Sequence, residues 1–166
     1  PDRRRPQRSG VSPMIVRPLE PDDRAAWDRL WAGYLEFYET ALSTEQTELT
    51  FARLIDPLDA VHGAIARDDG GRAVGLVHWL THLSTWSVGP YCYLEDLFVY
   101  EDARGSGIGA ALIEHVRAWA ERSGADKVYW LTQRGNDRAR ALYDRVAEDT
   151  GFVHYEIDLA PPRDER

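Results

Sequence analysis

The pattern of hydrophobic and polar positions changes period most clearly between residues 91 and 124. Tyr91–Val99 is an apolar and aromatic run interrupted only by Glu95 and Asp96, which predicts a buried strand. From Ile108 onward, apolar positions recur at helical spacing, and Gly124 is placed to end that helix. The short segment between strand and helix carries three glycines, Gly105, Gly107 and Gly109.

The same periodicities divide the rest of the chain into strands and helices. Strands are expected at Ile15–Arg17, Ala60–Arg67, Arg72–Leu83, Lys127–Leu131 and Phe152–Leu159. Helices are expected from Pro21 to Tyr38, from the capping box at Ser43 to Pro57, and from an Asn136 cap to Gly151. The resulting order is β-α-α-β-β-β-α-β-α-β, without an internal repeat or an interdomain linker.

The glycines between strand and helix are typical of an anion-binding loop. The free N–H groups of a first helical turn and the helix dipole both favour negative charge at this place. A Walker loop would end in Gly-Lys-Ser/Thr, whereas this loop ends in Gly-Ile-Gly. A Rossmann loop requires G-x-G-x-x-G and a carboxylate after the next strand, but here that strand is followed by Thr132-Gln133.

The loop instead fits R-x-x-G-x-G, and this pattern resembles the acetyl-CoA pyrophosphate loop of the GNAT N-acetyltransferases. YLEDLFV before the loop, and N-x-x-A-x-x-L-Y followed by Gly-Phe after it, extend the resemblance over the C-terminal half. The resemblance implies a single-domain α/β (α+β) fold, with a mixed, mostly antiparallel sheet of about six to seven strands flanked by about four helices. It also implies acetyl-CoA as the cofactor.

Composition narrows the alternatives without naming an activity. The 166 residues carry a net charge of −8, which argues against a nucleic-acid partner. No apolar run is long enough to cross a bilayer, so no membrane role is expected. The single cysteine, Cys92, offers no disulfide framework, and a cytoplasmic location is therefore expected. We expect a flexible basic tail at 1–13, the acetyltransferase domain at 14–160 and a C-terminal tail at 161–166.

The resemblance also implies which residues hold the cofactor. The backbone of Leu97, Phe98 and Val99 would face the acetyl and pantetheine parts. The pyrophosphate would lie on Arg104, Gly105, Ser106, Gly107, Ile108 and Gly109, where glycine lets the backbone approach phosphate oxygens. Asn136 and Tyr143 match residues near the thioester and the CoA arm.

Acetyl transfer to an amine needs a proton acceptor. An alkylamine has a pKa of about 10.4, so only about one molecule in a few thousand is neutral at pH 7. Glu95 and Asp96 are the candidate bases, and strand alternation puts them on opposite faces unless a bulge intervenes. The similar strand of diamine and polyamine acetyltransferases favours Glu95. Each carboxylate could instead pair with an arginine that holds the sheet.

Tyr143 is the candidate general acid for the departing CoA thiolate, because it matches the tyrosine of the family's last helix. Ordinary packing beside Leu142 and Val146 is the alternative for this residue. No convincing metal-ligand spacing is present, although His78 and His82 lie four residues apart on one strand face.

The acceptor site is predicted from aromatic and acidic residues of the N-terminal helix and of the loop before the central strand. Tyr34, Tyr38 and Trp86, together with Glu95, suit an amine cation, although an aromatic stripe at helical spacing is also typical of a core. The stretches around them are similar to the yeast histone/polyamine acetyltransferase branch and to the spermidine/spermine acetyltransferases. This resemblance implies a small amine, polyamine or amino acid as substrate, and a homodimer. Two alternatives stay open: a protein or histone-lysine acetyltransferase, and a non-catalytic acyl-CoA sensor.

Overall fold

The computed structural model describes residues 14–159. The two expected tails, at 1–13 and 161–166, lie outside the described residues. The chain divides into two compact units, one ending at Trp130 and the other beginning at Leu131. Each unit is described by itself.

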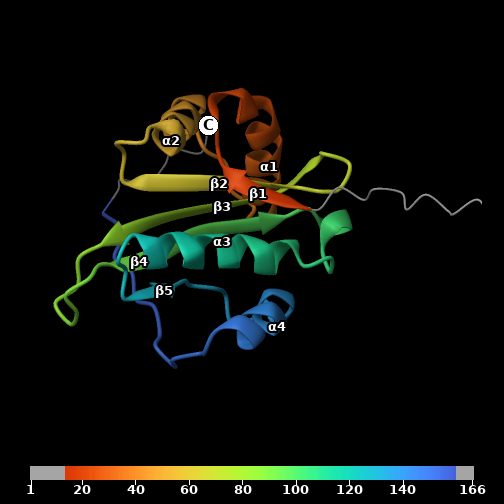
Figure 1. Ribbon diagram of the computed structural model, residues 1–166. Coiled ribbons are helices and arrows are strands. Elements are labelled where there is room, and N and C mark those ends of the chain that lie inside the picture. Colours follow the sequence, from red (N-terminus) through yellow and green to blue (C-terminus); the bar gives the residue numbers. More distant parts are fainter. Residues whose placement is uncertain (1–13, 160–166) are drawn as a thin grey trace, which may run out of the picture. The chain divides into compact units, whose positions relative to one another are not determined.

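The first unit is built on a five-stranded sheet in the order β1-β2-β3-β4-β5 (Figure 1). Its strands are β1 (Ile15–Pro18), β2 (Val61–Arg67), β3 (Ala73–His82), β4 (Tyr91–Val99) and β5 (Lys127–Tyr129). The first four strands pair antiparallel, and only β4 and β5 run parallel. The mixed, mostly antiparallel sheet is therefore confirmed, with five strands in the described chain where six to seven were expected.

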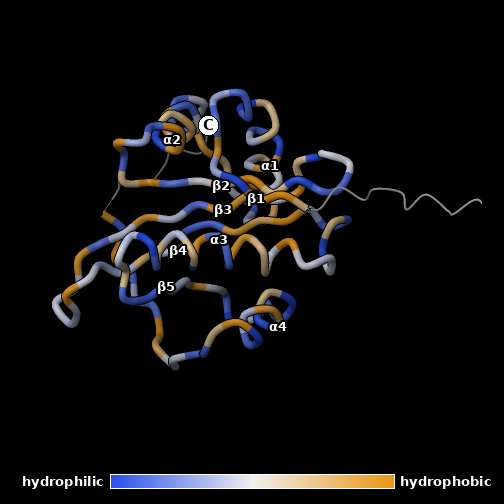
Figure 2. The backbone as a smooth tube through the Cα atoms, viewed as in Figure 1, coloured by the Kyte–Doolittle hydropathy of each residue, from blue (hydrophilic) through white to orange (hydrophobic). Residues whose placement is uncertain are grey.

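Helices of the first unit cover both faces of this sheet. The helices are α1 (Arg24–Phe37), α2 (Thr44–Ile55) and α3 (Ile108–Arg122) in the first unit, and α4 (Asp137–Val146) in the second. A Cβ placed on Gly63 of β2 would meet Leu54 of α2 and His78, whereas one on Gly75 of β3 would meet α3. Because Gly63 pairs with His78 in register, α2 lies on the face of His78 and α3 lies on the opposite face. Figure 2 shows hydrophobic and hydrophilic residues succeeding one another along α3, as expected for a helix with one buried side.

The core on the α1 side is unusually aromatic. Trp27 and Leu30 of α1 are fully buried and pack with Phe51 of α2, Leu76 of β3 and Phe98 of β4. Each such side chain contributes about 1.5–3 kcal/mol by leaving water. The α1 stripe is therefore core for most of its length, the alternative that the helical spacing had left open. No helix within the described range 14–159 combines the length and the apolar character needed to cross a bilayer.

One ion-pair network fixes the entry into α1. The Asp23 carboxylate is nearly fully buried and accepts hydrogen bonds from Arg17 (2.6 and 2.8 Å), Arg67 (2.8 Å) and the backbone N–H of Glu20 (3.0 Å). Burial alone would raise the pKa of Asp23, but these donors outweigh burial and lower it. The network joins β1, β2 and the turn before α1.

A β-bulge interrupts the pairing of β4 with β3. His78 pairs with Asp96 and Trp79 pairs with Leu94, so Glu95 is the extra residue on β4. The bulge reverses the alternation of side chains along β4. Asp96 therefore lies with Phe98 on the face covered by α1, whereas Leu94 pairs with Trp79 and lies on the other face. Uninterrupted alternation along β4 would have put Asp96 on one face with Cys92 and Leu94, and the bulge prevents this.

The second unit contains one helix and an irregular segment. The Asn136 side chain accepts from the N–H of Ala139 (3.4 Å), so the predicted cap of α4 is confirmed. The helix ends at Val146 and not at Gly151, and residues 152–159 form no strand. A strand needs a neighbour for its N–H and C=O groups, and none of the described strands pairs with this segment. Its apolar side chains are correspondingly exposed: Phe152, Val153, Tyr155, Ile157 and Leu159.

Candidate active site

The turn at residues 104–109, called the glycine turn here, joins the end of β4 to α3. Gly105 and Gly107 have φ of +85° and +87°, the left-handed region that glycine occupies without strain. A Cβ at either position would meet no atom within 4 Å, so the space beside the turn is open within the described chain. Both glycines are therefore required by the backbone rather than by crowding.

The N–H of Arg104 donates to the Glu101 carbonyl (3.2 Å), but the next three N–H groups of this turn have no partner within the described chain. Among the described residues, no backbone hydrogen bond is donated by Gly105, Ser106 or Gly107, and no side chain caps the start of α3. The first helical turn adds further free N–H groups at the positive end of the dipole. Together these donors make a site for a polyvalent anion such as a diphosphate.

The polar side chains of the turn are used locally. Arg104 donates from Nε to the Val99 carbonyl (2.8 Å), and its guanidinium lies 5.8 Å from the ring centre of Phe37. Ser106 donates to the carbonyl of Ala103 (2.6 Å). Arg104 therefore shapes the turn by holding it to the end of β4, and Ile108 anchors it through a side chain that is 4% exposed.

The second half of β4 has one open edge. β5 pairs in parallel only with Tyr91, Cys92 and Tyr93, and no other described strand continues along this edge to Val99. Leu97, Phe98 and Val99, predicted to bind the pantetheine arm, lie on this stretch directly before the glycine turn. Of the three carbonyls, that of Val99 is engaged by Arg104.

The bulged Glu95 lies at the surface within a group of tyrosines. Partial burial and then the negative charge of Asp96 raise the pKa of the Glu95 carboxyl. Burial and the charge of Glu95 in turn raise the pKa of Tyr93 to about 12 and raise that of Tyr129. The Tyr93 and Tyr129 rings stack at 5.1 Å, and the Tyr129 hydroxyl lies 2.9 Å from Nε2 of His82.

The Asp96 side chain lies on the buried face of the sheet that α1 covers. Its Oδ2 lies 2.9 Å from Nδ1 of His78, and Nε2 of His78 accepts from the indole N–H of Trp27 (3.0 Å). Tyr34 completes the surroundings: burial, followed by the charge and hydrogen bonding of Asp96, raises the pKa of its phenol. The two adjacent carboxylates thus occupy different environments because of the bulge.

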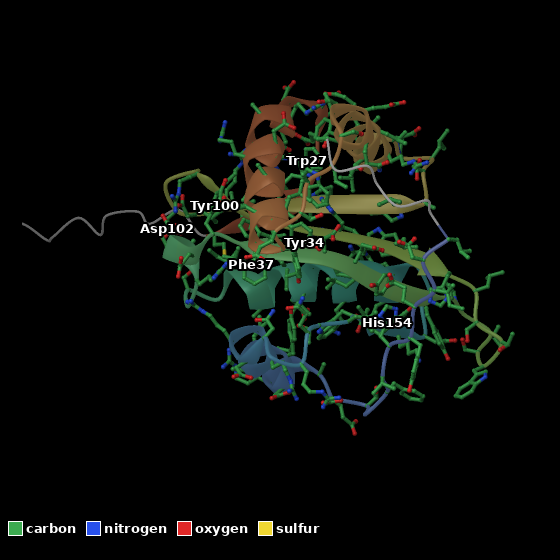
Figure 3. The ribbon with its side chains drawn as sticks, turned by 180° about the vertical axis from the view of Figure 1, so that it is seen from behind. Trp27, Tyr34, Phe37, Tyr100, Asp102 and His154 are labelled. Atoms are coloured by element: carbon green, nitrogen blue, oxygen red, sulfur yellow. The ribbon has the colours of Figure 1, made fainter. Side chains whose placement is uncertain are left out.

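Aromatic rings lead along α1 toward this acidic pair. Trp27 stacks on Trp31 at 5.6 Å, Trp31 on Tyr34 at 5.1 Å, and Tyr34 contacts Tyr38 at 4.9 Å. Figure 3 shows Trp27 and Tyr34 succeeding each other along α1, with Phe37 near its end. Tyr38 is 40% exposed, so the row of rings runs from the core to the surface.

The other predicted site residues are not gathered here. Trp86 is 85% exposed and takes part in none of the ring contacts among the described residues, so its role at an acceptor site stays a prediction. Asn136 and Tyr143 belong to the second unit. Their roles near the thioester likewise stay predictions.

Several neighbours of the acidic pair were not identified from the sequence. Tyr129 had been assigned only to a strand, and His78 only to a strand face that it shares with His82. A signal was present for Tyr129, since a parallel strand after the glycine-turn helix must lie beside β4. The pairing of His78 with Asp96 carries no such signal, because it depends on the bulge. Within residues 14–159, no group of three or more His, Cys, Asp or Glu side chains is close enough to hold a metal ion.

Comparison with known proteins identifies the family. Residues 26–147 match the acetyltransferase (GNAT) family. The chain is 43% identical over 143 residues to the D-amino-acid N-acetyltransferase HPA3 of Saccharomyces cerevisiae, covering 86% of this chain and 89% of that protein. It is 31% identical over 148 residues to the uncharacterized N-acetyltransferase YhfO of Bacillus subtilis, covering 88% and 98%.

Solved structures agree on the fold. The structure of AAC(6′)-Iy in complex with the bisubstrate analog CoA-S-monomethyl-acetylneamine superposes with a TM-score of 0.77 at 19% identity, covering 90% of this chain and all of that one (100%). At this identity the likeness concerns the fold alone. The family model matches most of this chain, and the fold agrees with that match. The chain therefore belongs to the GNAT family of acetyl-CoA-dependent N-acetyltransferases.

Proposed function

We propose that this enzyme acetylates the primary amine of a small molecule by direct attack, with Glu95 as the base and Tyr143 as the acid. The observation that carries the proposal is the bulge at Glu95. It puts a carboxylate of raised pKa at the surface, beside Tyr93 and Tyr129 and near the open edge of β4.

A base is needed because the acceptor arrives charged. Taking the neutral form of an alkylamine from a pool that is almost entirely protonated at pH 7 costs about 4–5 kcal/mol. A carboxylate of raised pKa is a better proton acceptor than an ordinary glutamate, and efficiency is highest when the pKa approaches the working pH. The acidic pair also attracts the ammonium form, and the faces of Tyr34 and Tyr38 suit the same cation.

The residues for the cofactor fit a diphosphate. The free N–H groups from Gly105 to Ile108 would hold the pyrophosphate, with Arg104 adding positive charge. At the open edge of β4, Leu97 would offer main-chain groups to the pantetheine arm, whereas those of Phe98 point toward β3. Acetyl-CoA supplies an activated acetyl thioester when bound. Asn136 and Tyr143, which belong to the second unit, keep their proposed roles near the thioester and the CoA arm.

The acceptor is best sought among small amines. The yeast relative is named for D-amino acids, a Caenorhabditis elegans relative that is 34% identical over 106 residues is named for thialysine, and one from Stenotrophomonas maltophilia for aminoglycosides. The 43% identity to the yeast protein supports an amino acid as the acceptor. The stretches around Tyr34 and Trp86 are similar to the yeast histone/polyamine acetyltransferase branch, which implies a polyamine as the alternative. We expect the homodimer that this branch implies, to be measured by light scattering.

The experiment is a free-thiol release assay with acetyl-CoA and a panel of amines. The panel contains D-amino acids, a diamine, spermidine, an aminoglycoside and a lysine-containing peptide, with no acceptor as the blank. Release with one of the small amines is expected, with the Glu95→Gln variant slower near neutral pH. Release with the peptide alone would refute the small-molecule proposal and favour a protein substrate.

A further inference from the structure

We propose that Trp27 and His78 are positioning residues: through a buried chain of hydrogen bonds they hold Asp96 as a fixed negative charge beside the bulged Glu95. This inference rests on the proposed function, because its consequence concerns Glu95 as the base. Neither aromatic residue would touch the substrate. They act through Asp96.

The chemistry of the partners fixes the form of His78. An indole N–H can only donate, so Nε2 of His78, 3.0 Å away, has to present a lone pair. In the neutral ring the proton then lies on Nδ1, which donates to Oδ2 of Asp96 at 2.9 Å. A proton on Nε2 would bring two donors together in the core, where both Trp27 and His78 are almost completely buried. Trp27 therefore selects the Nδ1–H form.

This arrangement keeps the Asp96 carboxylate in place. The carboxylate accepts from His78 on one side and interacts with Tyr34 of α1 on the other, and both contacts suit an acceptor without a proton. The titratable groups facing it are His78 from β3, Tyr34 and Tyr38 from α1, and Tyr93 and Glu95 from β4. All of these except Glu95 are neutral near pH 7 in the forms described here.

The bulge converts this buried anchor into an effect on the base. Asp96 is the residue on β4 that pairs with His78, so the side-chain contact and the backbone register coincide immediately next to Glu95. Two neighbouring carboxylates repel when both are charged, and Asp96 has no freedom to turn away. The pKa of the Glu95 carboxyl is thereby raised toward the pH at which the enzyme works. Tyr34 of α1, Tyr93 of β4 and Tyr129 of β5 add no positive charge near Glu95. A positive charge on His78 would lower the pKa of Glu95, but the hydrogen bond from Trp27 selects the uncharged Nδ1–H form.

The test is the pH dependence of kcat/KM in the Asp96→Asn variant. Asparagine keeps the shape and the acceptor for His78 but removes the charge. With the acceptor amine found in the thiol-release assay, the acidic limb of the profile should move to lower pH by about half a unit to one unit. An unmoved limb would overturn the proposal. Loss of activity at every pH, with Glu95→Gln unchanged, would make Asp96 the base and overturn it as well.

A matched pair of tryptophan variants tests the anchor. Trp27 and Trp31 lie one turn apart on α1 and both pack near His78, but the buried indole N–H of Trp31 has no hydrogen-bond partner among residues 14–159. Trp27→Phe should lower kcat/KM by about threefold to tenfold, the effect of one hydrogen bond, and shift the acidic limb. Trp31→Phe removes the same atoms and should leave the limb in place. Equal shifts in the two variants would show that Trp27 acts through packing and not through its hydrogen bond to His78, and would overturn the proposal.

A spectroscopic measurement needs no variant. Nitrogen-15 spectra of the histidine side chains of the unmodified protein should show His78 with its proton on Nδ1. A proton on Nε2 would overturn the proposal without bearing on the acetyltransferase reaction. Conversely, thiol release that does not depend on Glu95 would refute the proposed base while leaving the Nδ1–H form standing, so the two failures are distinguishable.

Discussion

Replacing Gly107 by alanine should separate backbone strain from loss of cofactor binding. Gly107 has φ of +87° and caps the start of α3, and an added methyl group would enter open space beside the glycine turn. Forcing an alanine into this region costs about 1–2 kcal/mol of stability. A turn that relaxes to avoid the strain withdraws one or two N–H donors from the anion. Each is worth about 1.5–3 kcal/mol to a charged acceptor, so acetyl-CoA affinity should fall by at least tenfold.

Gly124 offers the matched control, because it lies just beyond the other end of the same helix. Its φ is +73°, and a Cβ there would also meet nothing within 4 Å. The 15 residues of α3 separate the two glycines by about 22 Å. Urea unfolding should show similar destabilisation for both alanine variants, and calorimetry should show weaker acetyl-CoA binding for Gly107→Ala alone. Affinities within threefold of each other at equal destabilisation would refute the assignment of the turn to the pyrophosphate.

Three further substitutions address the reaction and the fold. Glu95→Gln should shift the profile of rate against pH toward higher pH, where the amine is already neutral; an unchanged profile would exclude Glu95 as the base. Tyr143→Phe should keep acetyl-CoA affinity within several-fold but slow transfer, and a collapse of affinity in calorimetry would assign Tyr143 to binding or packing instead. Asp23→Asn should cost about 2–3 kcal/mol in urea unfolding at pH 7, since Arg17 and Arg67 remain partly solvated and limit the loss. Because folding lowers the pKa of Asp23, its contribution to stability is fully present above the unfolded pKa of about 3.9 and is lost as the pH falls through the lower pKa of the folded protein. Equal stability of the Asp23→Asn variant and the unmodified protein at pH 7 would contradict this reasoning.

Local patterns were sufficient wherever the structure depends on neighbours in the sequence. The strand before the glycine turn, the helix after it and the cap at Asn136 are all observed. Each follows from a short-range rule, such as helical spacing or a side chain that accepts from an N–H three residues on. The GNAT fold was expected because the motif at 104–109, together with the strand before it and the helix after it, resembles that family.

Features that depend on long-range pairing could not be predicted in this way. The bulge at Glu95 is a mismatch between β3 and β4, and alternation along β4 alone assigned Leu94 and Asp96 to one face. The segment from Phe152 to Leu159 has the alternation of a strand, but pattern does not supply a partner strand. The hydrogen bond between Trp27 and His78 joins residues 51 positions apart, and neither residue reveals the other in the sequence.

The open stretch of β4 has a consequence for how this enzyme tolerates change over evolution. At Leu97 that edge offers peptide groups rather than a side chain, and every amino acid except proline supplies the same pair of groups. The peptide groups of the neighbouring Phe98 point toward β3, and its side chain is fixed by packing in the core. Substitutions at Leu97 can therefore accumulate more readily than at Phe98. Proline is the exception, because it has no peptide N–H, so replacing Leu97 by proline would remove a hydrogen-bond donor that every other replacement keeps.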